Sequence, residues 1–310
     1  MYRYILKRLL FLVPIVLGVT FIIFTVLSFI PGDPASIILG PGSLQEDIDK
    51  LNEQLGYNLP FIERYLRYIY NAFFHFDLGL SYATKLSVFT EVMVRLPISI
   101  LVAFNAISFA IVVGVPLGVL SAVKQYSLLD KIPSGLALFF ASLPLFLIGM
   151  VLMLFFSLQW RWFPSTGIGS WKHYVLPMFS IGLHYAGQQF RFTRSSMLET
   201  IRQDYVRTAR AKGATERAVI WRHALKNALL PVITVAGQNF SSLIGGSVVI
   251  ETLFGIPGLG VYVVTGVKQM DVPAVMGGLT IFAVVFSINM ILVDISYAFA
   301  DPRIRAKYRK

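Results

Sequence analysis

Long runs of apolar residues constrain the fold of this chain more than any other feature of its sequence. A helix needs about 20 mostly apolar residues to cross the roughly 30 Å of hydrocarbon in a bilayer. Six stretches of the chain fit this requirement, the fourth being the shortest. We therefore expect an all-α membrane protein with six transmembrane helices. The six stretches are Leu9–Ile30, Pro97–Leu120, Ile132–Leu158, Tyr174–Phe190, Asn227–Ile250 and Gly277–Ala300.

The composition agrees with a bilayer and excludes several other classes of protein. Charged residues make up 14% of the chain, whereas a water-soluble domain usually has about 25%. Apolar residues make up 56% and no low-complexity tract is visible, which excludes a disordered or collagen-like chain. There is no cysteine, and no two of the four histidines lie three or four residues apart. We therefore expect neither a disulfide nor a bound metal.

The distribution of basic residues predicts the orientation of the helices, because lysine and arginine favour cytoplasmic loops. Nineteen of the 27 lie at the two ends of the chain and in the loops 121–131 and 191–226, and the other three loops hold eight. Both termini are therefore expected in the cytoplasm. The same loops explain the net charge of +11, so we expect no nucleic-acid partner. The first apolar run is too long for a signal peptide and no A-x-A site follows it, so it is expected to be a retained anchor.

Residues 1–96 are expected to form the first transmembrane helix and a structured external loop. The run from Ser43 to Glu46 has the pattern of a capping box, which predicts a helix that begins there and stops at Gly56. A second amphipathic stretch, Phe61–Phe76, follows, with aromatic residues on one face. This stretch could be a docking surface for another protein or a lid on the helices beneath it, and we expect the lid.

Small and polar residues form a stripe on one face of the fifth apolar stretch. The stripe could line a hydrated translocation path, or it could join neighbouring helices, since both uses select the same residue types. The sequence does not favour one of these readings. In the second stretch, Gly114 and Gly118 are expected to make a close helix contact. The residues of the stripe are Thr234, Gln238, Ser241 and Gly245.

Few other polar groups lie inside the predicted spans. Asp294 is the only acid in the five most apolar stretches, and it is expected to pair with a basic loop residue. A proton relay would need several carboxylates at depth, so a relay is not predicted. In the fourth stretch, His184, Gln188 and Gln189 could face a cavity, but packing hydrogen bonds are the expected role.

The basic loop Arg191–Lys226 is the most informative segment of the sequence. Alanine, arginine and lysine favour helix up to Gly213, which breaks it, and Thr215 can cap a second short helix that runs through His223. Nine basic residues alone would fit an ordinary cytoplasmic loop. The small residues among the basic ones indicate a further role: their short side chains would let the helix fit into a groove on another protein. These small residues are Thr208, Ala209 and Ala211.

Three common catalytic motifs are absent from the sequence. There is no G-x-x-x-x-G-K-[ST] loop to hold the phosphates of ATP, no G-x-S-x-G nucleophile elbow and no H-E-x-x-H metal helix. The chain is therefore expected not to be an enzyme and to bind no cofactor. Any ATP must be used by a partner.

The basic loop also resembles that of a known family. Arg207, Thr208 and Ala209, followed by Gly213, are similar to the E-A-A-x-x-x-G loop of permease subunits from ABC-type importers. Arg207 and Thr208 replace the usual glutamate and alanine, which looks like the B-type permeases of the dipeptide, oligopeptide and nickel systems. Further matches follow in order: Pro31–Pro34, Phe76–Ser81, Thr193–Met197, Glu251–Phe254, Pro257–Gly260 and Asp301–Arg305.

The resemblance implies the fold and the partners of a type I (MetI-like) ABC importer in the inner membrane of a prokaryotic cell. Two related permease chains would pair, two ATPase subunits using ATP and magnesium would dock on their cytoplasmic loops, and an external binding protein would deliver substrate. Residues 97–300 would form a five-helix core and residues 301–310 a basic tail. The expected ATPase-coupling residues are Arg207, Thr208, Ala209, Arg210, Ala211, Lys212, Gly213 and Glu216.

The resemblance makes di- or oligopeptides the leading substrates, carried by alternating access that is coupled to the partner ATPases. Nickel chelates, glutathione and sugars are the alternatives within this class. A gradient-driven secondary transporter is less favoured, because such a protein is expected to have internal repeats or buried ion-coordinating acids. Neither is visible in the sequence.

Overall fold

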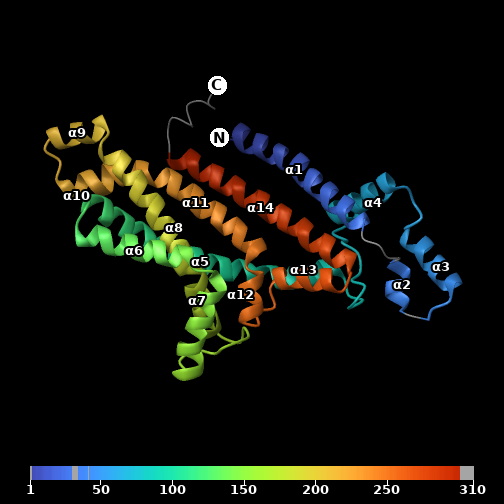
Figure 1. Ribbon diagram of the computed structural model, residues 1–310. Helices are drawn as coiled ribbons and strands as arrows, with labels where there is room; N and C mark the ends of the chain where they lie inside the picture. Colours follow the sequence, from blue (N-terminus) through green and yellow to red (C-terminus); the bar gives the residue numbers. More distant parts are fainter. Residues whose placement is uncertain (1, 30–33, 41, 301–310) are drawn as a thin grey trace. The chain divides into compact units, whose positions relative to one another are not determined.

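The computed structural model describes residues 2–29, 34–40 and 42–300, and this part of the chain is helical apart from its turns and one isolated bridge between Leu80 and Ser87. The predicted all-α class is confirmed (Figure 1). The matched motif at 301–305, the predicted tail and most of the motif at 31–34 lie outside the described residues. The helices are α1 (Tyr2–Ser28), α2 (Pro34–Leu39), α3 (Gln45–Leu55), α4 (Phe61–Phe74), α5 (Val88–Val123), α6 (Leu128–Ser142), α7 (Leu145–Leu152), a π-helical turn (Met153–Gln159), a 3-10 turn (Trp171–Tyr174), α8 (Val175–Ile201), α9 (Asp204–Ala211), α10 (Glu216–Ala218), a second π-helical turn (Val219–Ala224), α11 (Leu225–Gly246), α12 (Val248–Leu253), α13 (Leu259–Lys268) and α14 (Val272–Ala300).

Several of these helices can span a membrane. Within the described chain, four are long and apolar enough: the part of α1 from Leu9, all of α5, the continuous helix Glu216–Gly245, and α14 as far as Ser296. The segments Leu128–Ser142 and Leu145–Gln159 make a fifth span if they are taken together. The predicted fourth span lies in α8. This helix is long enough to cross a bilayer, but its residues are not apolar enough for it to count among these spans.

The third predicted span is not one continuous helix. α6 ends at Ser142, α7 begins at Leu145, and the two axes differ by 102°. Pro144 causes the break: it is the N-cap of α7, and Leu143 before it has the extended backbone that a following proline imposes. The prediction of a single helix over Ile132–Leu158 was wrong because hydropathy reports apolar length and is insensitive to one proline.

Two spans begin earlier than their apolar runs predict, and each early start brings an acid into a helix. The first turn of α5 holds Glu91, and the first turn of α6 holds Asp130. These carboxylates are only 7% and 4% exposed. The prediction that Asp294 is the only acid in the spans was therefore wrong, because the helices continue through polar turns that are buried against protein.

The chain divides into two compact units. The first consists of residues 2–7, 99–256 and 289–300, and the second of the described residues within 8–98 and 257–288. In the first unit, α8 packs against α6, α7 and α11 (Figure 1). This unit contains the basic loop and the polar stripe, and the second contains the external loop. The division at residues 97 and 301 that the sequence suggests remains a prediction.

Glycine permits close helix contacts in the first unit. An added Cβ at Gly114 would lie 2.7 Å from the carbonyl oxygen of Ala186, and one at Gly118 would lie 2.7 Å from the Cβ of Thr193. The predicted helix contact at this glycine pair is confirmed, and its partner is α8. This close packing leaves one polar side chain unsatisfied. Gln189, on the same stretch of α8, is fully buried, and neither atom of its amide has a hydrogen-bond partner in the described chain.

In the second unit, α4 covers part of α1. The hydroxyl of Tyr65 donates to the carbonyl oxygen of Leu17 at 2.7 Å, and the Tyr65 ring packs edge-on against Phe21. This contact agrees with the predicted lid. The predicted capping box at Ser43 was wrong: α3 begins at Gln45 after Leu44, and the Ser43 hydroxyl instead donates to a preceding turn. The predicted stop at Gly56 is confirmed by its left-handed backbone, with φ of 69°.

Candidate functional site

The basic loop of the first unit folds into a helix, a bend and a second helix. α9 ends at Ala211, and Gly213 follows with φ of +82°, a conformation that residues with a Cβ rarely adopt. Its amide donates to the carbonyl oxygen of Arg210 at 2.9 Å. Thr215 is the N-cap of α10, as predicted, and its hydroxyl accepts from the amide of Ala218. The predicted second short helix was wrong in length, since α10 and the π turn continue into α11.

An ion pair crosses the bend. Arg210 Nε donates to Glu216 Oε1 at 2.7 Å and Nη2 donates to Oε2 at 3.3 Å, so the guanidinium joins α9 to the start of α10. The hydrogen bond with Glu216 raises the pKa of Arg210 above its ordinary value. Both side chains are largely exposed, so the pair fixes the shape of the bend more than it stabilises the fold.

A hydrophobic cluster beneath the bend connects it to three long helices. Val206 of α9 is fully buried there, in one cluster with side chains of α5, α8, the second π turn and α11. A displacement of α9 must therefore move the ends of α8 and α11 together, because close-packed interiors transmit strain. The buried members of the cluster are Val119, Ala122, Met197, Val206, Val219, Ala224, Leu225 and Ala228.

The predicted coupling residues do not share one outward face. Thr208, Ala211 and Lys212 are exposed, whereas Ala209 is partly buried and packs against the hydrophobic cluster. Ala209 therefore contributes less to an outward surface than Thr208 and Ala211, and its predicted place in that surface remains a prediction. The sequence analysis assigned no role to Trp221, which is exposed in the second π-helical turn. Exposed aromatic residues of this kind are typical anchors in protein interfaces.

The polar stripe of α11 divides in the structure. Ser241 is buried, and its hydroxyl accepts from Asn289 Nδ2 of α14 at 2.5 Å. The same amide donates to the carbonyl oxygen of Gly237 at 2.8 Å. Gly237 itself lies so close to α14 that an added Cβ would overlap the side chain of Val293. Ser241 thus joins two helices.

The other members of the stripe are more open. Gln238 and Gly245 are exposed, and Thr234 is half-buried with its hydroxyl bonded within its own helix. Neighbouring polar residues contribute to packing: the Gln188 amide lies 3.2 Å from His184 Nε2 and accepts from Asn239 of α11. The predicted packing hydrogen bonds are present for Gln188. They were also predicted for Gln189, whose amide has no hydrogen-bond partner in the described chain.

An ion pair between a buried carboxylate and a partly exposed arginine ties α6 to α8 near the basic loop. Arg194 Nε and Nη2 donate to the two carboxylate oxygens of Asp130 at 2.7 and 2.9 Å. Ser121 of α5 donates to the same carboxylate at 2.5 Å, and the amide of Tyr126 adds a fourth bond. Three helices therefore meet at one carboxylate that the sequence analysis did not single out. Asp130 and Arg194 are 64 residues apart in the sequence, so their spacing gives no indication that they pair in the fold.

A second buried carboxylate lies in the matched motif Glu251–Phe254. Glu251 is completely buried, and its Oε1 accepts from Ser99 of α5 at 2.7 Å and from Ser247 at 2.9 Å. The short helix α12 is thereby fixed to α5 within the first unit. This explains why a carboxylate can stand in so apolar a segment.

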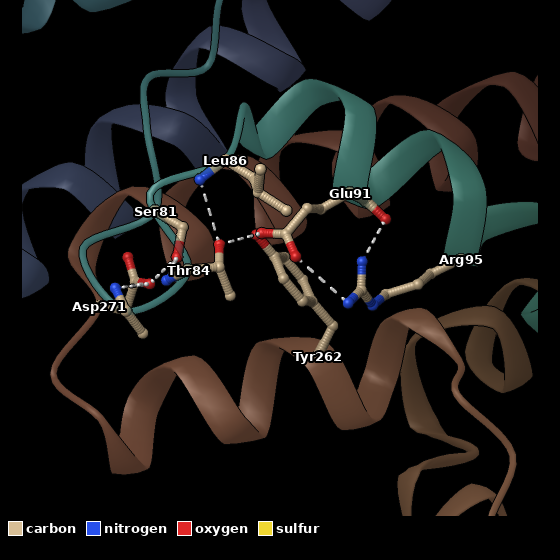
Figure 2. A network of polar contacts seen from close by, with 8 residues as sticks. Ser81, Thr84, Leu86, Glu91, Arg95, Tyr262 and Asp271 are labelled. Atoms are coloured by element: carbon tan, nitrogen blue, oxygen red, sulfur yellow. Dashed lines mark hydrogen bonds and ion pairs between the residues drawn. The ribbon is translucent and has the colours of Figure 1, made fainter.

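In the second unit, a polar network holds the loop that contains the motif Phe76–Ser81 (Figure 2). The Ser81 hydroxyl and the amide of Ala83 both donate to Asp271 Oδ2, at 2.5 and 3.2 Å. Burial, with the charge of Asp271 as a smaller cause, raises the pKa of Tyr82 to about 12. The loop is therefore clamped at one end to the turn between α13 and α14.

Glu91 clamps the other end of this loop (Figure 2). It accepts from the Thr84 hydroxyl at 3.0 Å and from the Tyr262 hydroxyl of α13 at 3.1 Å, and Arg95 lies 3.3 Å away. The Arg95 guanidinium also stacks on the Tyr262 ring, 4.6 Å from its centroid. The described residues contain no group of three acids or histidines that could hold a metal.

Comparison with known proteins places these features in one family. The model of the family described as "Binding-protein-dependent transport system inner membrane component" matches residues 114–306, and the model of its N-terminal part matches residues 1–103. The glutathione transport system permease protein GsiC of Escherichia coli is 36% identical over 307 residues, which cover 99% of this chain and all of that protein. GsiC of Shigella dysenteriae is similar to the same extent.

A solved structure supports the fold. The inward-facing MetNI methionine ABC transporter contains a chain that matches with a TM-score of 0.57 at 18% identity. The match covers 68% of this chain and 96% of that one.

Proposed function

Because the chain belongs to the family of binding-protein-dependent transport system inner membrane components, and is thus the permease subunit of a bacterial ABC importer, we propose that it forms half of a translocation path for di- or oligopeptides. It is a multi-pass protein of the inner membrane and is not itself catalytic, since a partner ATPase hydrolyses the ATP. ATPase and binding-protein partners follow from the family. A second related permease and a pair of ATPases complete the proposed assembly.

The observation that carries the peptide proposal is the full-length similarity to GsiC, a permease of a glutathione transport system, since glutathione is a tripeptide. The test is the ligand that the external binding protein of this importer retains. We expect the purified binding protein to hold a di-, tri- or oligopeptide, and vesicles containing the complete importer to take up that peptide with ATP. A binding protein that retains a nickel chelate or a sugar and no peptide would contradict the proposal.

We propose that the bend at Gly213 is the lever through which ATP drives the transport cycle. To invert a 1:99 equilibrium between inward-facing and outward-facing forms, about 5.5 kcal/mol of differential binding is needed, which the nucleotide sites of the ATPases supply. The hydrophobic cluster around Val206 supports this role, because it joins the lever to the ends of α8 and α11. Exposed Thr208, Ala211 and Lys212 are the proposed contacts with the ATPase.

The exposed part of the α11 stripe is proposed to face the translocation path. A cysteine at Gln238 or Gly245 is expected to react with a small water-soluble thiol reagent in resting or ATP-trapped complexes. Ser241→Cys is expected to stay protected, because Ser241 is buried against Asn289. Mass spectrometry of the labelled chain measures this cleanly, since the chain has no native cysteine.

The control for this labelling is Phe139→Cys, at an exposed apolar position on α6 where we expect lipid. A thiol in lipid stays protonated and unreactive. If neither Gln238→Cys nor Gly245→Cys is labelled more than this control in either state, the whole stripe serves packing.

The outer face of α4 is proposed to receive the binding protein. Its inner face packs on α1, but Ile62, Leu66, Tyr70 and Phe74 form an exposed apolar stripe, with Leu66 59% exposed. Apolar stripes of this kind mark interaction sites.

Leu66→Glu is expected to weaken capture of the binding protein about tenfold, as loss of a central contact does. Glu63→Gln, on the same helix, is the control and should bind normally. Normal uptake by Leu66→Glu at the wild-type protein level would contradict this role.

A further inference from the structure

A cavity of about 360 Å³ lies between α6 and α8 in the first unit. The two helices run antiparallel, since Gly187 of α8 meets Ala137 of α6, and Arg194 further along α8 meets Asp130 at the start of α6. At the first contact a Cβ on Gly187 would lie 2.5 Å from the Ala137 carbonyl oxygen, so the helices touch there. The cavity lies beside these contacts, at the end of α8 that leads into the basic loop.

The polar wall of this cavity carries uncompensated positive charge. Arg191 and Arg194 both line it, one helical turn apart. Arg194 is neutralised and held in place by Asp130, whereas Arg191 is exposed and makes no ion pair in the described chain. Ser195 adds a hydroxyl group to the lining, whereas the Ser134 hydroxyl beside it already donates to Asp130 at 3.3 Å. This side of the cavity thus offers a fixed guanidinium, a guanidinium without an ion-pair partner and one hydroxyl, which suits a phosphate.

The rest of the lining is apolar and partly exposed. Phe190 is buried in it, and Leu138 lines it while remaining 59% exposed. Leu136 and Phe139 of the same helix are also exposed. The cavity therefore joins basic side chains near the loop to an apolar surface on α6 that an acyl chain can contact.

We propose that this α6–α8 cavity binds the headgroup of an anionic phospholipid from the cytoplasmic leaflet. The phosphate lies against Arg191 and Arg194, and the upper part of an acyl chain runs along Leu138. Basic cavities between transmembrane helices on the cytoplasmic side recognise anionic headgroups in this way. The orientation comes from the positive-inside distribution of lysine and arginine. A free phosphate shares the headgroup chemistry but cannot use the apolar wall.

The test uses the full-length chain, assembled with its partner subunits, in phosphatidylcholine vesicles that contain spin-labelled phosphatidylglycerol. Electron paramagnetic resonance measures the immobilised fraction of the labelled lipid, and hence its preference for the protein relative to labelled phosphatidylcholine. The wild type is expected to prefer phosphatidylglycerol. Arg191→Gln is expected to reduce that preference about fivefold, as removal of one basic group near a membrane surface does. Arg191→Lys should retain most of it, since the charge remains.

Arg202→Gln is the matched control. It removes the same charge from the exposed end of the same helix but does not line the cavity. It should leave the preference unchanged. Equal losses in Arg191→Gln and Arg202→Gln, or no preference in the wild type, would overturn the proposal. Competition by excess inorganic phosphate would also overturn it, because the cavity would then be a site for free anions.

Discussion

Gly213→Val is expected to abolish substrate-stimulated ATP hydrolysis and transport while the permease still reaches the membrane. The cause is the backbone, because Gly213 has φ of +82° and an added Cβ would meet no atom within 4 Å. Holding a residue with a Cβ in this left-handed conformation costs roughly 2 kcal/mol, which shifts the population of the bent form about thirtyfold. The spans can still insert, since the bend lies outside the apolar stretches.

The control for this lesion is Lys212→Gln, which removes an exposed charge beside the bend and leaves the backbone unstrained. It should lower coupling only slightly. ATP hydrolysis and uptake are measured in reconstituted complexes. Crosslinkers placed at Thr208 and Ala211 should reach the ATPase, whereas one at Ala209 should not, because Ala209 packs inward. Wild-type transport by Gly213→Val would refute the lever, as would crosslinks that never reach the ATPase.

Much of this bend is visible in the sequence, because its determinants are local. A glycine after a run of helix-forming residues is enough to predict the break, and a threonine directly before α10 is enough to predict the N-cap. The inward position of Ala209 is not visible, because it depends on helices that are distant in sequence. For the same reason the sequence predicts a helix near Val206 but not that Val206 anchors it.

The spans show the same division between local and long-range information. Apolar length predicts that α1, α5, α11 and α14 exist. It misses the bend at Pro144 and the early starts of α5 and α6, where polar side chains such as Asp130 are buried only because another helix pairs with them. The resemblance to importer permeases adds the family and its motifs, but it does not say that Ser241 joins α14 while Gln238 is open.

Asp130→Ala is expected to destabilise the complex by about 2 kcal/mol, less than the cost of breaking a fully buried ion pair, because the Arg194 side chain is partly exposed. Asp130 is almost fully buried and accepts from Arg194, Ser121 and the amide of Tyr126. Its loss leaves these donors without their acceptor and separates three helices at one point. A lower midpoint of thermal unfolding for the purified complex, and less permease in the membrane, are the expected measurements.

A double-mutant cycle separates this pairing from ordinary loss of packing. If the ion pair carries the effect, Asp130→Ala with Arg194→Ala is less destabilised than the sum of the two single changes, because the double variant strands no charge. Glu46→Ala is the matched control: it breaks the exposed pair with Lys50 in α3, which should contribute well under about 1 kcal/mol. Additive single effects, or an equal loss in Glu46→Ala, would show that Asp130 does not hold α5, α6 and α8 together, and the basic loop would then rest on the hydrophobic cluster alone.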